Sequence, residues 1–242
     1  MALIDELEKQ GNFLFKYRGQ FPVFLFILVV PFMYYTNSVN PKLAENYTII
    51  AIFLSFLGFL IRCYTIGTTP RGTSGRNTKQ QIAEELNSTG IYSIVRHPLY
   101  LGNYFMWIGI VVYTYNLYFI LFVSLLYWLY YERIMFAEER FLERKFGQIF
   151  LKWSSQLPAF VPNFSRFKKS HISFSLISVL RREYSGVLAT VIGFSYVSVL
   201  RHYFEYKRWE IDQKHIVVLL TAAVLSIILR TLKRHTKVLE ET

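Results

Sequence analysis

Long apolar stretches alternate with short polar or basic segments along this chain. Six of them are candidate membrane spans, at residues 21–35, 47–64, 99–115, 117–131, 185–200 and 216–229. All six fall short of the ~20 residues of an ideal helical crossing, and Pro31 is expected to break the first. The pattern predicts an all-α, polytopic integral membrane protein with about six helical spans.

Two of these stretches are separated only by Asn116, which indicates a tight helical hairpin. The following segment, 132–152, interleaves charged and apolar residues. It predicts an amphipathic helix at the cytoplasmic face, interrupted near Gly147. A short helix is expected over Thr78–Leu86, and the charged, amphipathic residues 1–20 do not resemble a cleavable signal peptide. We divide the chain into an N-terminal two-span region (1–64), a central core (65–162) and a C-terminal region (163–242).

Composition supports a membrane protein over a soluble one. Hydrophobic residues make up 53% of the 242 residues and aromatic residues 18%, which is too apolar for an ordinary soluble domain. The formal charge of +11 could suggest a nucleic-acid partner, but the basic residues flank apolar stretches and form no single basic face. The expected partners are therefore the bilayer and a membrane lipid, with no nucleic acid. The single cysteine excludes an intrachain disulfide.

The distribution of basic residues predicts an orientation. With six spans, 22 lysines and arginines lie on the side of the two termini and 5 on the other side. The positive-inside rule places the side with the termini in the cytoplasm.

The most informative polar stretch runs from Gly90 to Gly102 and contains Arg96, His97 and Pro98. Arg96 and His97 stand at a predicted membrane boundary, where a basic pair can simply anchor a helix end. A second polar pair, Glu138-Glu139, follows one hairpin later and could by itself be a solvated helix face. Because a hairpin returns the chain to the side it left, we expect the two polar segments to meet.

Several motifs in the stretch 87–162 resemble a known family. They are Gly90-Ile91-Tyr92, Arg96-His97-Pro98-Leu99-Tyr100-Leu101-Gly102, the apolar hairpin, Glu138-Glu139 with Leu142, Phe146-Gly147, and Leu157-Pro158-Ala159-Phe160-Val161-Pro162. Their order resembles the membrane methyltransferases of the isoprenylcysteine carboxyl methyltransferase and phospholipid methyltransferase superfamily. The chain differs in having Phe150 and Trp153 where the family often has tyrosines, and in about eighty residues beyond Pro162.

The resemblance implies a lipid methyltransferase that uses S-adenosylmethionine at the cytoplasmic face. Glu138 or Glu139 could meet the amino group or ribose, Arg96 or His97 the carboxylate, and Tyr100 or Tyr104 the adenine. No metal site is expected. The full set of candidates for cofactor binding is Arg96, His97, Pro98, Leu99, Tyr100, Gly102, Glu138 and Glu139, with His97 and Arg96 also the catalytic candidates.

The acceptor is less well defined. A basic group formed by Arg71, Arg76, Asn77 and Lys79 is the candidate substrate-binding segment, and its local pattern resembles bacterial members related to the lipid A phosphate methyltransferase. We favour a phosphate or carboxylate oxygen as the methylated atom. An aminophospholipid or a prenylcysteine carboxylate is the alternative acceptor, and a non-catalytic scaffold or a small transporter is the alternative outside enzymes.

Overall fold

The computed structural model describes residues 2–36, 39–70 and 81–240, and within them the fold is all-helical. The helices are α1 (Leu3–Tyr17), α2 (Phe21–Tyr34), α3 (Pro41–Gly67), α4 (Pro98–Val112), α5 (Leu117–Phe146), α6 (Gln148–Ser154), α7 (Leu176–Tyr206) and α8 (Gln213–His235), with short 3-10 turns at Ile91–Ser93 and Phe164–Arg166. Among the described residues, β-type pairing is limited to one isolated bridge between Gly90 and Lys168.

Four helices are long and apolar enough to cross a membrane, namely α3, α5, α7 and α8. They carry the exposed apolar side chains expected of an integral membrane protein. The apolar helices α2 and α4 have 14 and 15 residues and are shorter than a full crossing.

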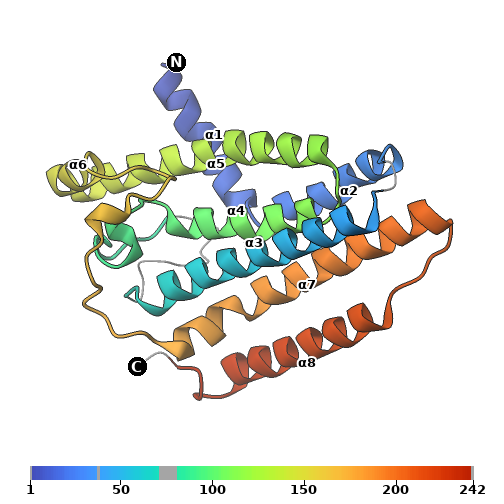
Figure 1. The fold of residues 1–242 in the computed structure, drawn as a ribbon. Coiled ribbons are helices and arrows are strands. Elements are labelled where there is room, and N and C mark those ends of the chain that lie inside the picture. Colours follow the sequence, from blue (N-terminus) through green and yellow to red (C-terminus); the bar gives the residue numbers. More distant parts are fainter. Residues whose placement is uncertain (1, 37–38, 71–80, 241–242) are drawn as a thin grey trace.

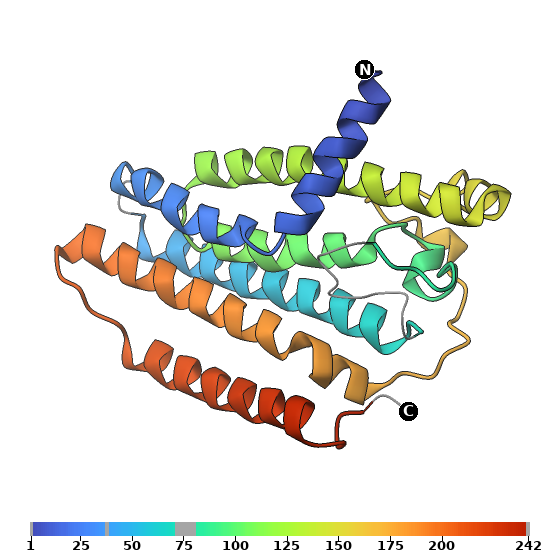
Figure 2. The same ribbon diagram turned by 180° about the vertical axis from the view of Figure 1, so that it is seen from behind.

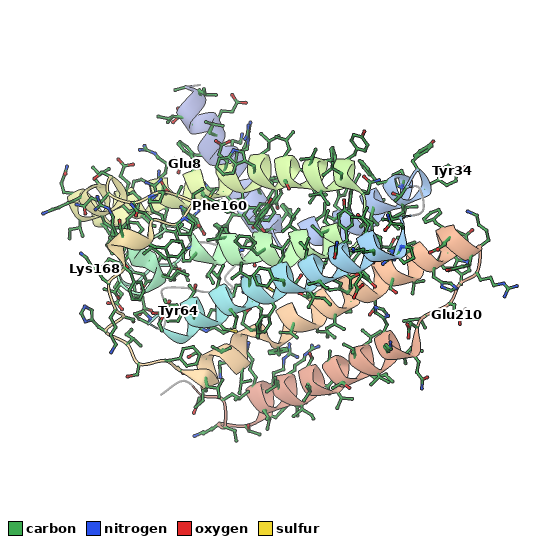
Figure 3. All side chains as sticks on the ribbon, viewed as in Figure 1. Glu8, Tyr34, Tyr64, Phe160, Lys168 and Glu210 are labelled. Atoms are coloured by element: carbon green, nitrogen blue, oxygen red, sulfur yellow. The ribbon has the colours of Figure 1, made fainter. Side chains whose placement is uncertain are left out.

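Helices α5, α4, α3, α7 and α8 follow one another in that order across the bundle, and α8 packs along α7 at its edge (Figures 1 and 2). Helix α1 crosses α5 on the outside of the bundle (Figure 2). Tyr64 and Lys168 lie at one end of the molecule, and Tyr34 and Glu210 lie at the other (Figure 3). The α4–α5 hairpin turns at the second end, as predicted, so the start of α4 and the end of α5 meet at the first end (Figure 1).

Small residues let α3 and α4 approach closely. A Cβ atom added to Gly109 would lie 2.5 Å from the carbonyl oxygen of Ala51, and one added to Gly58 would lie 2.5 Å from the carbonyl oxygen of Gly102. The hydroxyl of Ser55 donates to the carbonyl oxygen of Met106 at 2.8 Å. Close packing of small residues is a common way for helices to associate in membranes.

Several sequence-based boundaries were wrong. Pro31 does not break α2: it stands inside the helix, which continues to Tyr34 although Pro31 has no N–H to donate, and the carbonyl oxygen of Pro31 still accepts from the N–H of Tyr35. Helices α3 and α7 extend well beyond the apolar runs: Asn40 caps the first residues of α3, and Ser175 caps α7. Residues 81–86 are not helical; several of them instead line the cavity described below. The remainder of that predicted helix, and the candidate substrate residues Arg71, Arg76, Asn77 and Lys79, lie outside the described residues.

Candidate active site

The loop before α4 is held in place by the segment that follows α6. Gly90 has a φ of +60°, a conformation that side chains disfavour, and its N–H donates to the carbonyl oxygen of Lys168 at 2.8 Å. The N–H of Lys168 in turn donates to the hydroxyl of Ser93 at 2.8 Å. The loop is therefore anchored to a segment almost eighty residues later in the chain.

The Leu-Pro-Ala motif positions the two basic residues through its backbone. The N–H of Arg96 donates to the carbonyl oxygen of Pro158 at 3.0 Å, and the N–H of His97 donates to that of Ala159 at 3.2 Å. The guanidinium of Arg96 also donates to the carbonyl oxygen of Ser154 at 2.8 Å. These contacts aim both side chains toward the end of α5.

The Arg-His pair and the Glu-Glu pair meet. Nε2 of His97 lies 2.8 Å from Oε1 of Glu139, and Nδ1 of His97 lies 3.6 Å from Oε2 of Glu138. Arg96 Nε forms an ion pair with Glu139 at 3.0 Å. The hydroxyl of Tyr100 donates to Glu138 at 2.7 Å. The structure therefore brings together five of the eight candidate cofactor residues in one network.

The network favours the charged form of His97. His97 is 7% exposed. Burial would by itself lower the pKa of His97, but the adjacent carboxylates of Glu138 and Glu139 outweigh it and raise this pKa above the ordinary value. The imidazolium form is thus favoured, enclosed between two carboxylates.

A cavity of about 470 Å³ opens beside this network. Its walls come from α1, α3, α4, α5, α6, α7 and the segment 81–97, and the predicted residues among its lining are Arg96, His97, Pro98, Leu99, Tyr100 and Glu138. A volume of this size is typical of small-molecule sites.

Three candidates do not line the cavity. Glu139 is not among the lining residues and contacts Arg96 and His97 instead. Gly102 faces α3, where an added Cβ atom would lie 2.6 Å from Cγ of Arg62. Tyr104, a candidate for the adenine, does not line the cavity, and its hydroxyl donates to Ser124 at 3.0 Å.

The sequence reasoning missed a second set of polar residues on the cavity wall. We call Arg62, Asn103 and Glu183 the inner polar cluster. Arg62 donates to the two carboxylate oxygens of Glu183 at 2.7 and 2.6 Å and to the side-chain oxygen of Asn103 at 2.5 Å. All three residues line the cavity. Arg62 stands out in the sequence as a charge at the end of an apolar run, whereas Glu183 directly follows Arg181 and Arg182 and is masked by these basic neighbours.

Trp153, which departs from the family pattern, also lines the cavity. Its indole N–H is buried and has no hydrogen-bond partner among the described residues. A bound molecule with an acceptor atom would satisfy it. Within the described part of the chain, no group of three or more His, Cys, Asp or Glu residues could hold a metal ion.

Comparisons with known proteins match part of this chain to a protein family and to curated relatives. Residues 46–149 match the family described as phospholipid methyltransferase. The protein-S-isoprenylcysteine O-methyltransferase of Schizosaccharomyces pombe is 26% identical over 129 residues, which are 50% of this chain and 54% of that protein. The nickel-cobalt-cadmium resistance protein NccN of Alcaligenes xylosoxydans xylosoxydans is 33% identical over 84 residues, 35% of this chain and 39% of that protein. No solved structure gives a significant match.

These matches confirm the resemblance to the membrane methyltransferase superfamily. The matched segments span about half or less of the curated relatives' lengths. The family match includes α4, the whole of α5 and the polar network, whereas α1, α7 and α8 lie outside it.

Proposed function

We propose that this protein is a membrane methyltransferase that uses S-adenosylmethionine and methylates an anionic oxygen, phosphate or carboxylate, on a lipid headgroup. The observation that carries the proposal is the buried network of Arg96, His97, Tyr100, Glu138 and Glu139 beside a cavity of about 470 Å³. Burying so many polar groups in an apolar bundle costs free energy, and polar groups in such positions usually belong to a functional site.

The lining residues suit S-adenosylmethionine. The Glu138 carboxylate would hold the ligand's amino group or ribose hydroxyls, and the Trp153 indole N–H offers a donor that no described residue uses. The aromatic and apolar side chains of Tyr92, Phe141 and Leu142 supply a wall for the adenosine. When bound, this cofactor supplies an electrophilic methyl group on a sulfonium sulfur. The protein's contribution is to orient both reactants and to exclude water.

The state of His97 favours an anionic acceptor over an amine. An amine must lose a proton before it can be methylated, and His97 is the candidate base. Yet both of its nitrogens face carboxylates, which raise its pKa and favour the protonated form. A phosphate or carboxylate needs no base, so His97 and Arg96 act here by organising the site with Glu139.

The placement of the site favours access from the cytoplasm. The loop before α4, the end of α5 and the segment after α6 lie at one end of the bundle (Figure 1). This end belongs to the side with 22 of the 27 lysines and arginines. In this topology the short helices α2 and α4 complete six spans.

Transfer of labelled methyl groups tests the proposal. Membranes that contain the protein are incubated with S-adenosylmethionine labelled in its methyl group, and lipids are then extracted. We expect label in the lipid fraction for the wild type and for Glu143→Gln, and at least tenfold less for Glu138→Gln. Glu143 is a suitable control because it pairs with Arg140 on the same helix and does not line the cavity.

The product identifies the acceptor. A carboxyl methyl ester releases its label as methanol under mild alkaline hydrolysis, whereas a methyl phosphate and a methylated amine both retain it. Hot strong acid then releases the label from the phosphate ester but not from the amine. Absence of label in lipid from wild-type membranes would refute a lipid methyltransferase and leave the scaffold or the transporter.

A further inference from the structure

The inner polar cluster places charges inside helices that are otherwise apolar. Arg62 belongs to α3, Asn103 to α4 and Glu183 to α7. The side chains of Arg62 and Glu183 are 14% and 2% exposed. Charged residues so enclosed within a helical membrane bundle are most often functional.

With the helix ends that face the loop segments taken as the outer edge of the headgroup layer, the cluster lies close to the depth of lipid headgroups. Arg62 and Asn103 each stand about five residues inside the helix end that faces the loop segments, or about 8 Å at 1.5 Å per residue. The headgroup layer on each side of a bilayer is about 5–8 Å thick. A lipid headgroup drawn into the cavity would therefore reach Arg62 while its chains stay in the apolar layer.

The cluster also retains capacity for a ligand. A guanidinium has five N–H groups, and three of those of Arg62 are used by Glu183 and Asn103. Two remain for an anion, on a residue that lines the cavity. The lining as a whole has four arginines (Arg18, Arg62, Arg96 and Arg182) against three glutamates (Glu85, Glu138 and Glu183), so its net charge is positive.

We propose that the inner polar cluster is the subsite for an anionic lipid headgroup, in which Arg62 binds the anionic oxygens and Glu183 is the positioning residue that holds Arg62. This inference rests on the proposed function and names the place where its acceptor binds. Glu183 comes from α7, outside the residues that match the family, so the C-terminal region takes part in acceptor selection.

A purely structural ion pair between α3 and α7 is the competing explanation. Such a pair would stabilise the packing of the two helices and would not bind an anionic ligand. Replacing both charges together distinguishes the subsite from the structural ion pair, because the double variant leaves no unpaired buried charge. The test variant is therefore Arg62→Gln/Glu183→Gln. Its control is Glu8→Gln/Arg144→Gln, which removes a similar two-bond ion pair between α1 and α5 that does not line the cavity.

The experiment measures binding to the purified protein in a neutral detergent, with no turnover. The probes are dihexanoyl phosphatidic acid, octanoate, dihexanoylglycerol and inorganic phosphate. We expect the wild type and the control to bind one of the two anionic lipids, and to bind dihexanoylglycerol and inorganic phosphate at least tenfold more weakly. The Arg62→Gln/Glu183→Gln variant should bind that anionic lipid at least tenfold more weakly and S-adenosylmethionine within twofold of the wild type.

Asn103→Ala is the second variant, because it removes a contact to Arg62 while both charges stay paired. It should weaken anionic-lipid binding severalfold, and it decides the question if the double variant does not fold. Equal anionic-lipid binding by wild type and variants, or preference for free phosphate over both lipids, would overturn the subsite. Because no turnover is needed, a wild type that binds the lipid but transfers no methyl group would refute only the proposed function.

Discussion

Glu139 is predicted to hold the site together from behind the cavity wall. Its carboxylate contacts Nε2 of His97 at 2.8 Å and Nε of Arg96 at 3.0 Å, and it does not line the cavity. Glu139→Gln keeps the shape of the side chain and removes its charge. The imidazolium of His97 and the guanidinium of Arg96 would then share one neutral amide oxygen.

The magnitude follows from burial. His97 is 7% exposed and Glu139 24%, so the interactions are largely shielded from water. Hydrogen bonds to charged groups at such positions contribute about 1.5–3 kcal/mol, and Gln retains part of this. We therefore expect Glu139→Gln to lower the free energy of unfolding by about 2 kcal/mol. For a chain of this size that is a fall in melting temperature of about 4–8 °C.

The assay is thermal unfolding of the purified protein in detergent, with Glu143→Gln as control. Glu143 and Arg140 are both 34% exposed, so the loss of their ion pair should cost less than about 1 kcal/mol. Equal shifts in the two variants, or no shift in Glu139→Gln, would refute the role of Glu139 as the residue that fixes Arg96 and His97.

Three further predictions concern pH, helix packing and the loop. Because the pKa of His97 is raised in the folded protein, its contribution to stability should be complete below its ordinary pKa of 6.5 and should be lost as pH rises through the folded pKa. Melting temperatures measured across pH should show this decline in the wild type but not in His97→Gln. Gly109→Ala should lower the melting temperature, because the added Cβ atom would lie 2.5 Å from the backbone of α3. Gly186→Ala is the control and should not lower it, because the nearest atom to its Cβ would be 3.6 Å away. Similar changes in melting temperature for the two variants would contradict this packing. Ser93→Ala removes the acceptor of the Lys168 N–H and should weaken S-adenosylmethionine binding severalfold, measured by titration; unchanged binding would show that this anchor does not shape the site.

The meeting of the two polar pairs could be predicted from sequence because it depends on topology alone. A hairpin of two apolar segments returns the chain to the same side, and this is sufficient to bring Glu138 and Glu139 near Arg96 and His97. The amphipathic pattern also located the break at Gly147, where α5 ends and α6 begins.

Other features depend on interactions that no local pattern reveals. Arg62 and Glu183 are 121 residues apart, and their pairing follows from the packing of α3 against α7. Hydropathy also underestimated the lengths of α3 and α7, whose caps Asn40 and Ser175 begin these helices in polar sequence. The role of Pro158 and Ala159 lies in their carbonyl groups, which side-chain chemistry does not predict.

Equilibrium binding of labelled S-adenosylmethionine to the purified protein tests the central claim most directly. We predict saturable binding of one molecule per chain, weakened at least tenfold in Glu138→Gln and changed less than twofold in Glu143→Gln. Absence of saturable binding in the wild type, or equal binding by Glu138→Gln, would contradict the assignment of this cavity as the cofactor site.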